Sequence, residues 1–137
     1  MRLAALITLL AGCGADDTGF VDVSPDAPTI TDGHAWCATS GESSNVTSWY
    51  VELTGDDPQG VDTLERMGGL LAVYTAESHN EVFREDLLVC SAEGACVGSF
   101  TEEASGVLCA NPQNYTLEAT LYDQDQNASR PYTLPID

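Results

Sequence analysis

The sequence predicts an all-β fold, an antiparallel β-sandwich of about seven or eight short strands stapled by disulfides. Three observations predict it. Apolar and polar residues alternate in several stretches, as they do in a strand with one buried and one solvated face. Turn-forming residues such as Asp56–Pro58 and Asn111–Pro112 separate these stretches. Four cysteines lie beyond residue 33, an even number that can crosslink the strands in pairs.

The first residues have the composition of a targeting segment. Met1 and Arg2 form a short positive start, and residues 3–10 are apolar apart from Thr8. This apolar stretch is too short to cross a hydrocarbon layer of about 30 Å as a helix. Ala11 and Gly12 are the small residues that precede a cleavage point, so residues 1–12 are predicted to be a signal peptide.

The run Leu10, Ala11, Gly12 and Cys13 resembles the lipobox of bacterial lipoproteins. The resemblance implies cleavage before Cys13 and attachment of lipid to the sulfur and the new amino group of that cysteine. It also implies that this lipid is the contact with the membrane. In this class an aspartate after the cysteine favours the inner membrane, so Gly14 implies the outer membrane of the cell envelope. An acidic protein is repelled by anionic headgroups, and the acyl chains offset that repulsion.

Residues 13–33, which begin with the lipidated Cys13, are predicted to be an acidic flexible tether. Five aspartates and two prolines occur between Gly14 and Gly33. Such a segment buries little apolar surface, and its like charges repel one another. An alternative is that residues 28–31 form an edge strand, in which Pro28 limits further pairing. The folded domain then comprises residues 34–137.

Within residues 34–137 the alternation predicts the individual strands. In the clearest of them, Trp49, Val51 and Leu53 alternate with polar or amphipathic residues. The predicted strands are 35–39, 48–53, 70–75, 82–90, 96–101, 106–109, 115–122 and 130–134. Between the second and third, Val61, Leu64 and Met67 predict about two helical turns that end at Gly68 and Gly69.

The four remaining cysteines are predicted to form two disulfides, as is usual in exported chains. Four cysteines allow three pairings. We favour Cys90 with Cys96, which closes a short turn between two predicted strands, and Cys37 with Cys109.

Residues 114–122 and the polar turn 123–129 resemble the last two strands of immunoglobulin-like and fibronectin-type-III-like modules of bacterial surface proteins. The resemblance implies an immunoglobulin-like sandwich. The chain departs from the immunoglobulin pattern at Cys109, which precedes the strand that contains Tyr115 instead of lying inside it.

Residues for catalysis are sparse, and the sequence predicts no enzyme. His34 and His79 lie in no metal-binding spacing. Residues 94–98 match the Gly-x-nucleophile-x-Gly frame with Cys96 as nucleophile, but that elbow needs a strand leading into a helix. Cys90 lies six residues earlier, so a disulfide hairpin is favoured. A small carboxylate-based hydrolase is the enzymatic alternative, and it requires two carboxylates at a set separation in a cleft.

A calcium site is the most specific cofactor hypothesis. Asp123, Asp125, Asn127 and Ser129 place oxygen ligands at alternate positions, as a loop around a hard cation requires. The pattern departs from an EF-hand loop at Ala128 and Leu134. In a hairpin these side chains would converge with Asp32, Asp56 or Asp57 from neighbouring loops. The alternative is a solvated polar turn with no metal. If a calcium ion is bound, the domain would be a calcium-binding adhesion-type module.

The charge balance excludes nucleic acid as a partner. The 137 residues contain 22 acidic and 4 basic side chains, a formal net charge of -18, and binding to phosphates needs clustered cations. The prediction is a non-catalytic binding or structural module, anchored in the envelope and facing the periplasm or the cell surface. Its partner is an unidentified envelope protein or glycan. Tyr50, Tyr122 and Tyr132 would provide the contacts if they share one face.

Overall fold

The computed structural model describes residues 23–40 and 45–137. Leu10–Cys13, the predicted signal peptide and residues 13–22 of the predicted tether lie outside the described residues. Within the described ranges, seven strands form one antiparallel sheet, in the order β1-β2-β5-β4-β3-β6-β7. The strands are β1 (Thr29–Ser40), β2 (Val46–Asp56), β3 (Met67–Thr75), β4 (Glu81–Cys90), β5 (Ala95–Thr101), β6 (Tyr115–Thr120) and β7 (Tyr132–Leu134). The predicted all-β antiparallel fold is therefore confirmed.

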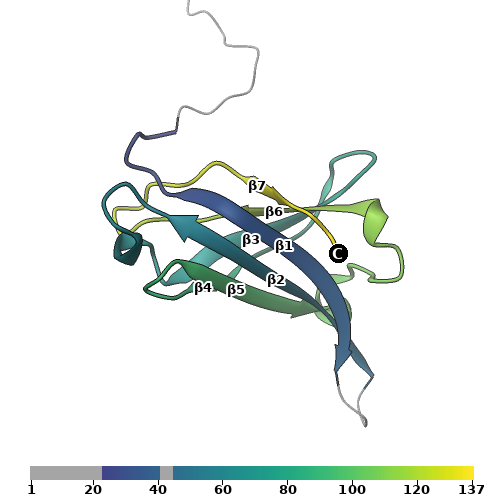
Figure 1. The fold of residues 1–137 in the computed structure, drawn as a ribbon. Helices are drawn as coiled ribbons and strands as arrows, with labels where there is room; N and C mark the ends of the chain where they lie inside the picture. Colours follow the sequence, from purple (N-terminus) through teal and green to yellow (C-terminus); the bar gives the residue numbers. More distant parts are fainter. Residues whose placement is uncertain (1–22, 41–44) are drawn as a thin grey trace, which may run out of the picture.

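The two layers of the predicted sandwich are halves of this one sheet, which curls until its edge strands meet (Figure 1). The Ala35 amide donates a hydrogen bond to the Pro135 carbonyl (2.8 Å), and the Asp137 amide donates one to the Ala35 carbonyl (2.9 Å). Twist accumulates from strand to strand and brings the ends of a long sheet together. The result is a nearly closed, barrel-like sheet around one interior.

The interior includes the inward side chains that the alternation predicted in β2. In β2, Trp49, Val51 and Leu53 are buried. They share the core with Leu71 and Val73 of β3, Leu88 of β4, Phe100 of β5, and Leu117 and Ala119 of β6. The Trp49 ring stacks on Phe100 at 6.2 Å between centroids, and its indole donates a hydrogen bond to the Val107 carbonyl (3.0 Å). The largest buried side chain thus has its polar group satisfied.

β1 begins before residue 34, as in the alternative of an edge strand at residues 28–31. It starts at Thr29, so residues 29–33 belong to the sheet and not to the tether, and Ile30 pairs with Gly55 of β2. Ala27 and Pro28 just before it are buried. The aspartates and prolines of this segment suggested an extended tether, but pairing with β2 offsets the entropy cost of ordering residues 29–33.

The predicted strand 106–109 is wrong. The short helix α1 (Glu102–Ser105) follows β5, with the Thr101 hydroxyl capping the Ala104 amide (3.0 Å). Gly106, at φ 73°, ends the helix in the left-handed conformation. The following loop places Val107 under Trp49. Its apolar residues cover the core without pairing into the sheet.

The predicted helix at residues 61–67 is also wrong in extent. A single 3-10 turn, η1 (Val61–Thr63), is present, and Met67 already opens β3. Gly68, at φ 95°, lies in an irregular part of that strand. A Cβ on Gly69 would lie 2.7 Å from the Leu88 Cβ. Gly69 therefore serves the close approach of β3 to β4, Gly68 serves a left-handed backbone conformation, and neither ends a helix. A second turn, η2 (Pro112–Asn114), leads into β6.

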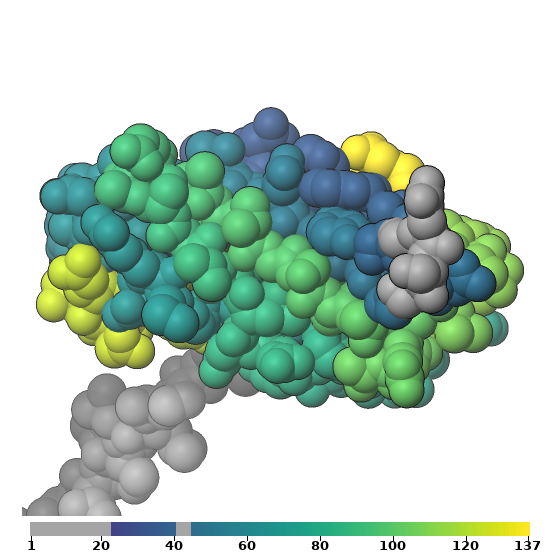
Figure 2. Space-filling view, turned by 90° about the horizontal axis from the view of Figure 1, so that it is seen from below, coloured from purple at the N-terminus to yellow at the C-terminus, as the bar shows by residue number. Residues whose placement is uncertain are grey.

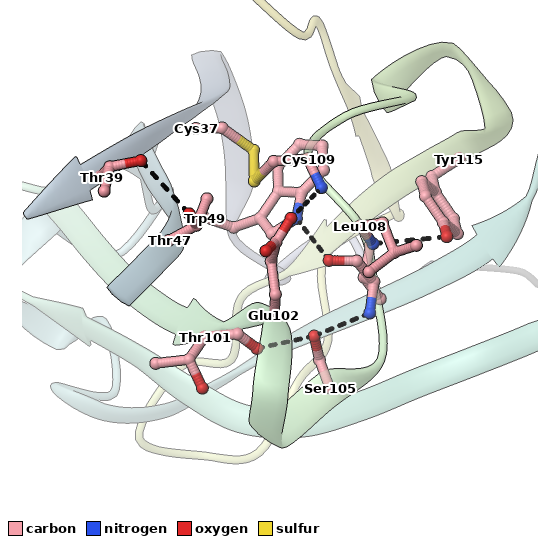
Figure 3. The surroundings of a disulfide bond; sticks show 11 residues. Cys37, Thr39, Thr47, Trp49, Thr101, Glu102, Ser105, Leu108, Cys109 and Tyr115 are labelled. Atoms are coloured by element: carbon pink, nitrogen blue, oxygen red, sulfur yellow. Dashed lines mark hydrogen bonds between the residues drawn. A yellow bond between two sulfur atoms is a disulfide. The ribbon is translucent and has the colours of Figure 1, made fainter. Parts of the chain in front are cut away.

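Both favoured disulfides are present. Cys37–Cys109 ties β1 to the loop after α1 (Figure 3), and Cys90–Cys96 joins directly opposite residues of β4 and β5. Near the first, the Glu102 carboxylate accepts a hydrogen bond from the Cys109 amide, and the Tyr115 hydroxyl accepts one from the Leu108 amide (3.4 Å). The Cys37–Cys109 disulfide and the hydrogen bond to Tyr115 hold the irregular segment 106–114 against the sheet. As half of a disulfide, Cys96 has no free thiol to act as a nucleophile.

Candidate functional site

The outer face of the sheet carries a row of side chains that crosses five strands. Register pairs Met67 of β3 with Val89 of β4, Val89 with Val97 of β5, Val97 with Glu52 of β2, and Glu52 with His34 of β1. Directly opposite residues of antiparallel strands point to the same face. We call Met67, Val89, Val97, Glu52 and His34 the cross-sheet row. Figure 2 shows this side of the molecule, with residues of β4 and β5 in green across the middle.

Three neighbouring members of the cross-sheet row are apolar and exposed. The exposed fraction is 72% for Met67, 47% for Val89 and 50% for Val97. Single exposed apolar residues are common on proteins, but contiguous ones mark interaction surfaces. Val89 lies between the buried Leu88 and Cys90, and Val97 follows the buried Cys96. Both valines are thus on the solvent side of strands whose opposite side already fills the core.

Sequence reasoning missed the cross-sheet row, although part of it was accessible. The favoured Cys90–Cys96 pairing fixes the register of β4 and β5 at that point, and one step along it Val89 faces Val97. Because side chains alternate, two valines next to inward cysteines must point outward. No comparable sequence feature connects Met67 to this pair, because an irregular stretch of β3 comes after it.

An aromatic stack adjoins the cross-sheet row. Trp36 of β1 lies opposite Tyr50 of β2, with ring centroids 5.6 Å apart. The ring of His34, two residues before Trp36 on the same strand, stacks on Trp36 at 5.0 Å. Trp36 and Tyr50 are half-buried. The three rings support one another and form a fixed apolar surface beside Glu52.

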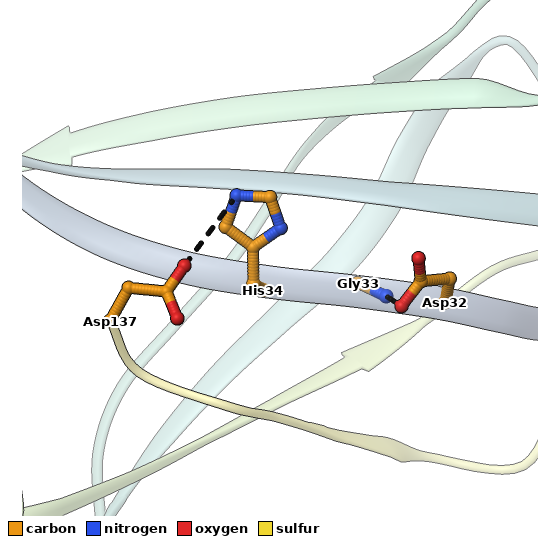
Figure 4. Close-up of polar contacts among 4 residues, drawn as sticks. All are labelled: Asp32, Gly33, His34 and Asp137. Atoms are coloured by element: carbon orange, nitrogen blue, oxygen red, sulfur yellow. Dashed lines mark hydrogen bonds and ion pairs between the residues drawn. The ribbon is translucent and has the colours of Figure 1, made fainter.

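His34 also faces a carboxylate. Its Nε2 lies 3.8 Å from Asp137 Oδ2, and both side chains are solvent-exposed (Figure 4). On the same strand, Asp32 Oδ1 accepts a hydrogen bond from the Gly33 amide (2.9 Å). A contact between His34 and Asp137 at such an exposed position contributes little to stability because water and salt screen it.

A shallow hollow lies at each end of the cross-sheet row. The first, of about 370 Å³, is lined by residues of β1, β2 and β5: Asp32, Gly33, His34, Glu52, Leu53, Thr54, Ala95, Cys96 and Val97. The second, of about 450 Å³, is lined by Glu65, Met67, Gly68, Asp86, Tyr122 and Gln126. Each hollow therefore contains two carboxylates and one exposed apolar residue of the row.

The three tyrosines predicted as contacts do not gather at one place. Tyr50 belongs to the aromatic stack, and Tyr122 lines the hollow beside Met67. Tyr132 packs against the core. The structure instead gathers Trp36, His34 and Tyr50, two of which the sequence did not single out as contacts.

The residues of the calcium hypothesis lie in a tight turn after β6. Asp123 is fully buried, and both its carboxylate oxygens accept hydrogen bonds from Asn127, one from the amide (2.7 Å) and one from Nδ2 (2.8 Å). The Ser129 hydroxyl accepts a hydrogen bond from the Leu121 amide (2.9 Å), whereas Asp125 is exposed. Asp123 and Asn127 are thus brought together, but as partners of one another. The calcium site stays a prediction.

The other residues singled out in the sequence lie apart from the cross-sheet row. His79, in the turn between β3 and β4, stacks on Tyr74 at 4.4 Å. Asp57 is buried, with Oδ1 accepting a hydrogen bond from the Gln59 amide (2.8 Å). Within residues 23–40 and 45–137, no three His, Cys, Asp or Glu side chains come together as metal ligands. In the same ranges, none of the helices has the length and apolar character to cross a membrane.

Comparison with known proteins gives no relative. The chain matches no family model, and no curated protein or solved structure is significantly similar to it. Its function is therefore inferred from the residues described above.

Proposed function

We propose that this chain is an envelope-anchored lipoprotein, held at the outer membrane by lipid on Cys13, whose domain is a non-catalytic binding module. The observation that carries the binding role is the cross-sheet row, with Met67, Val89 and Val97 exposed side by side. Burying apolar surface is the main source of affinity in protein association. Aromatic residues and methionine are also enriched in interfaces, and the stack of Trp36 and Tyr50 lies next to the row.

Export is supported by the two disulfides and by the lipobox resemblance. Disulfides persist in oxidising compartments and are rare in the cytosol. Cys37–Cys109 and Cys90–Cys96 use all the cysteines after Cys13. A chain with this many acidic residues needs the acyl chains to stay at a membrane surface.

Metabolic labelling tests the anchor. The full chain is expressed in a bacterium that is fed an alkyne fatty acid, and we expect label on the wild type and none on Cys13→Ser. Labelling that persists in Cys13→Ser would contradict the anchor.

Photo-crosslinking in intact cells tests the binding surface. Val97 and Leu108 make a matched pair, since both are apolar and each is 50% exposed, but only Val97 lies in the cross-sheet row. We expect benzoylphenylalanine at position 97 to give a discrete adduct and the same group at position 108 to give none. Mass spectrometry of the adduct then distinguishes a protein from a glycan. Equal adducts from both positions, or none from position 97, would refute the proposal.

A further inference from the structure

We infer that the cross-sheet row binds a polypeptide segment with lysines or arginines on both sides of a short apolar stretch. This inference rests on the proposed binding function and specifies the chemistry of the partner. Its basis is the surroundings of Met67, Val89 and Val97, the three apolar members of the row: two carboxylates line the hollow on the Met67 side, and two line the hollow on the Val97 side.

The apolar middle consists of Met67, Val89 and Val97 on three adjacent strands. Neighbouring strands are about 4.8 Å apart, so these three side chains span about 10 Å. That length matches about three residues of an extended chain. A segment lying across the strands would therefore place a short apolar stretch over the middle of the row.

The two ends are acidic. Glu65 and Asp86 line the hollow beside Met67, and Asp32 and Glu52 line the hollow beside Val97. No lysine or arginine is among the described residues that line either hollow. Cationic side chains that flank the apolar stretch of a partner would reach these carboxylates. Complementary charge of this kind steers association and sets the register of the bound segment.

The arginines of the domain do not neutralise this arrangement. Arg84 donates a hydrogen bond to Glu81 (3.1 Å), and that hydrogen bond raises the pKa of its guanidinium. Arg130 lies with several prolines and Tyr132 around a different hollow. Arg66 adjoins Glu65 and Met67 in the chain but does not line the hollow that they share. The surface potential around the row therefore favours a cationic partner.

The aromatic stack favours a polypeptide over a glycan. A sugar ring binds by lying on the face of an aromatic ring, and the largest ring here, Trp36, already stacks with both His34 and Tyr50. A peptide needs no free ring face, because it contacts the exposed methyl groups of Val89 and Val97.

Three synthetic peptides test this inference. They share one apolar core of valine and phenylalanine and carry two lysines, two serines or two glutamates at each end. Fluorescence anisotropy measures their affinity for the full chain carrying Cys13→Ser. We expect the lysine peptide to bind at least tenfold more tightly than the serine peptide, and the glutamate peptide to bind most weakly.

Neutralising single carboxylates localises the effect. We substitute one carboxylate in each hollow, by Glu52→Gln and by Glu65→Gln. Each variant should bind the lysine peptide about threefold more weakly and bind the serine peptide with unchanged affinity. Glu77→Gln is the matched control, since it removes the same charge from an exposed turn that lines neither hollow. The effects should shrink in 1 M salt, where charges are screened within about 3 Å.

The outcomes separate this inference from the proposed function. Equal affinity for the three peptides, lost on Val97→Ser, would keep the binding surface and overturn its preference for cations. A Glu77→Gln effect as large as that of Glu52→Gln would also overturn it, because the attraction would then belong to the whole domain. The polypeptide partner would be rejected if none of the three peptides binds, or if the adduct at position 97 contains a glycan. The crosslinking experiment, and not the peptide assay, decides whether the cross-sheet row binds a partner at all.

Discussion

The two faces of β2 carry different roles on alternate residues. Trp49, Val51 and Leu53 point inward and are buried, whereas Glu52 points outward as a member of the cross-sheet row and Tyr50 points outward beside it. The inward set packs into the shared core of the sheet, while the outward set contacts its neighbours on β1 and β5. Successive side chains of a strand point to opposite faces of the sheet, so a substitution on the outer face leaves the core side chains unchanged. The effects on folding and on binding can therefore be measured separately.

The two tryptophans provide the sharpest test of this difference. Trp49→Ala removes a buried ring and leaves the Val107 carbonyl without its donor, so we expect a loss of about 3–5 kcal/mol in the free energy of unfolding. Trp36→Ala removes a half-buried ring of the outer stack, and a loss of about 1 kcal/mol is expected. Denaturant unfolding of both variants measures the two losses. Similar losses would show that the outer stack is part of the core.

The two disulfides should also differ. Each constrains the unfolded chain according to the length of the loop it closes, and the sequence separations are 72 for Cys37–Cys109 and 6 for Cys90–Cys96. Replacing Cys37 and Cys109 by serine should lower the free energy of unfolding by about 4 kcal/mol. Replacing Cys90 and Cys96 by serine should lower it by about 2 kcal/mol. Unfolding of the two double variants under identical conditions provides the measurement. The reverse order would indicate that local packing outweighs chain entropy.

The Asp123 turn predicts a smaller effect. Asp123→Ala leaves the two Asn127 donors, which are partly buried, without their acceptors, so a loss of about 1–3 kcal/mol in the free energy of unfolding is expected. Asp125→Ala, at an exposed position of the same turn, should change stability by less than about 0.5 kcal/mol. Melting temperatures with millimolar calcium and with chelator complete the test. If calcium raises the melting temperature of the wild type but not that of either variant, the metal site is established.

Substitutions in the cross-sheet row should change the stability of the domain least. Val97→Ser and Val89→Ser remove exposed methyl groups, and each should alter the free energy of unfolding by less than about 0.5 kcal/mol. Both variants should nevertheless bind the lysine peptide more weakly in the anisotropy measurement. Leu108→Ser, equally exposed but outside the row, is the control that should leave binding unchanged. A large destabilisation by Val97→Ser would assign this residue to the folding face.

Local patterns in the sequence predicted much of the fold. The alternation around Trp49 and Leu117 identified β2 and β6, because the buried face of a strand must be apolar at every second residue. The cysteine spacing favoured the two disulfides that are present. One error fell where a local pattern fits two structures: a pair of glycines is common after a helix, but here Gly68 adopts a positive φ within β3 and Gly69 allows the close approach of β4.

By itself, the sequence determined the all-β class, the inward residues of the clearest strands and the excess of negative charge. These are properties of single segments, set by side-chain period and composition. Only the tertiary structure decided that one sheet closes through Ala35 and Pro135, and that Met67, Val89 and Val97 lie side by side. Both depend on register between strands distant in sequence. Register results from the twist of the whole sheet and the packing of its core, which no single segment encodes.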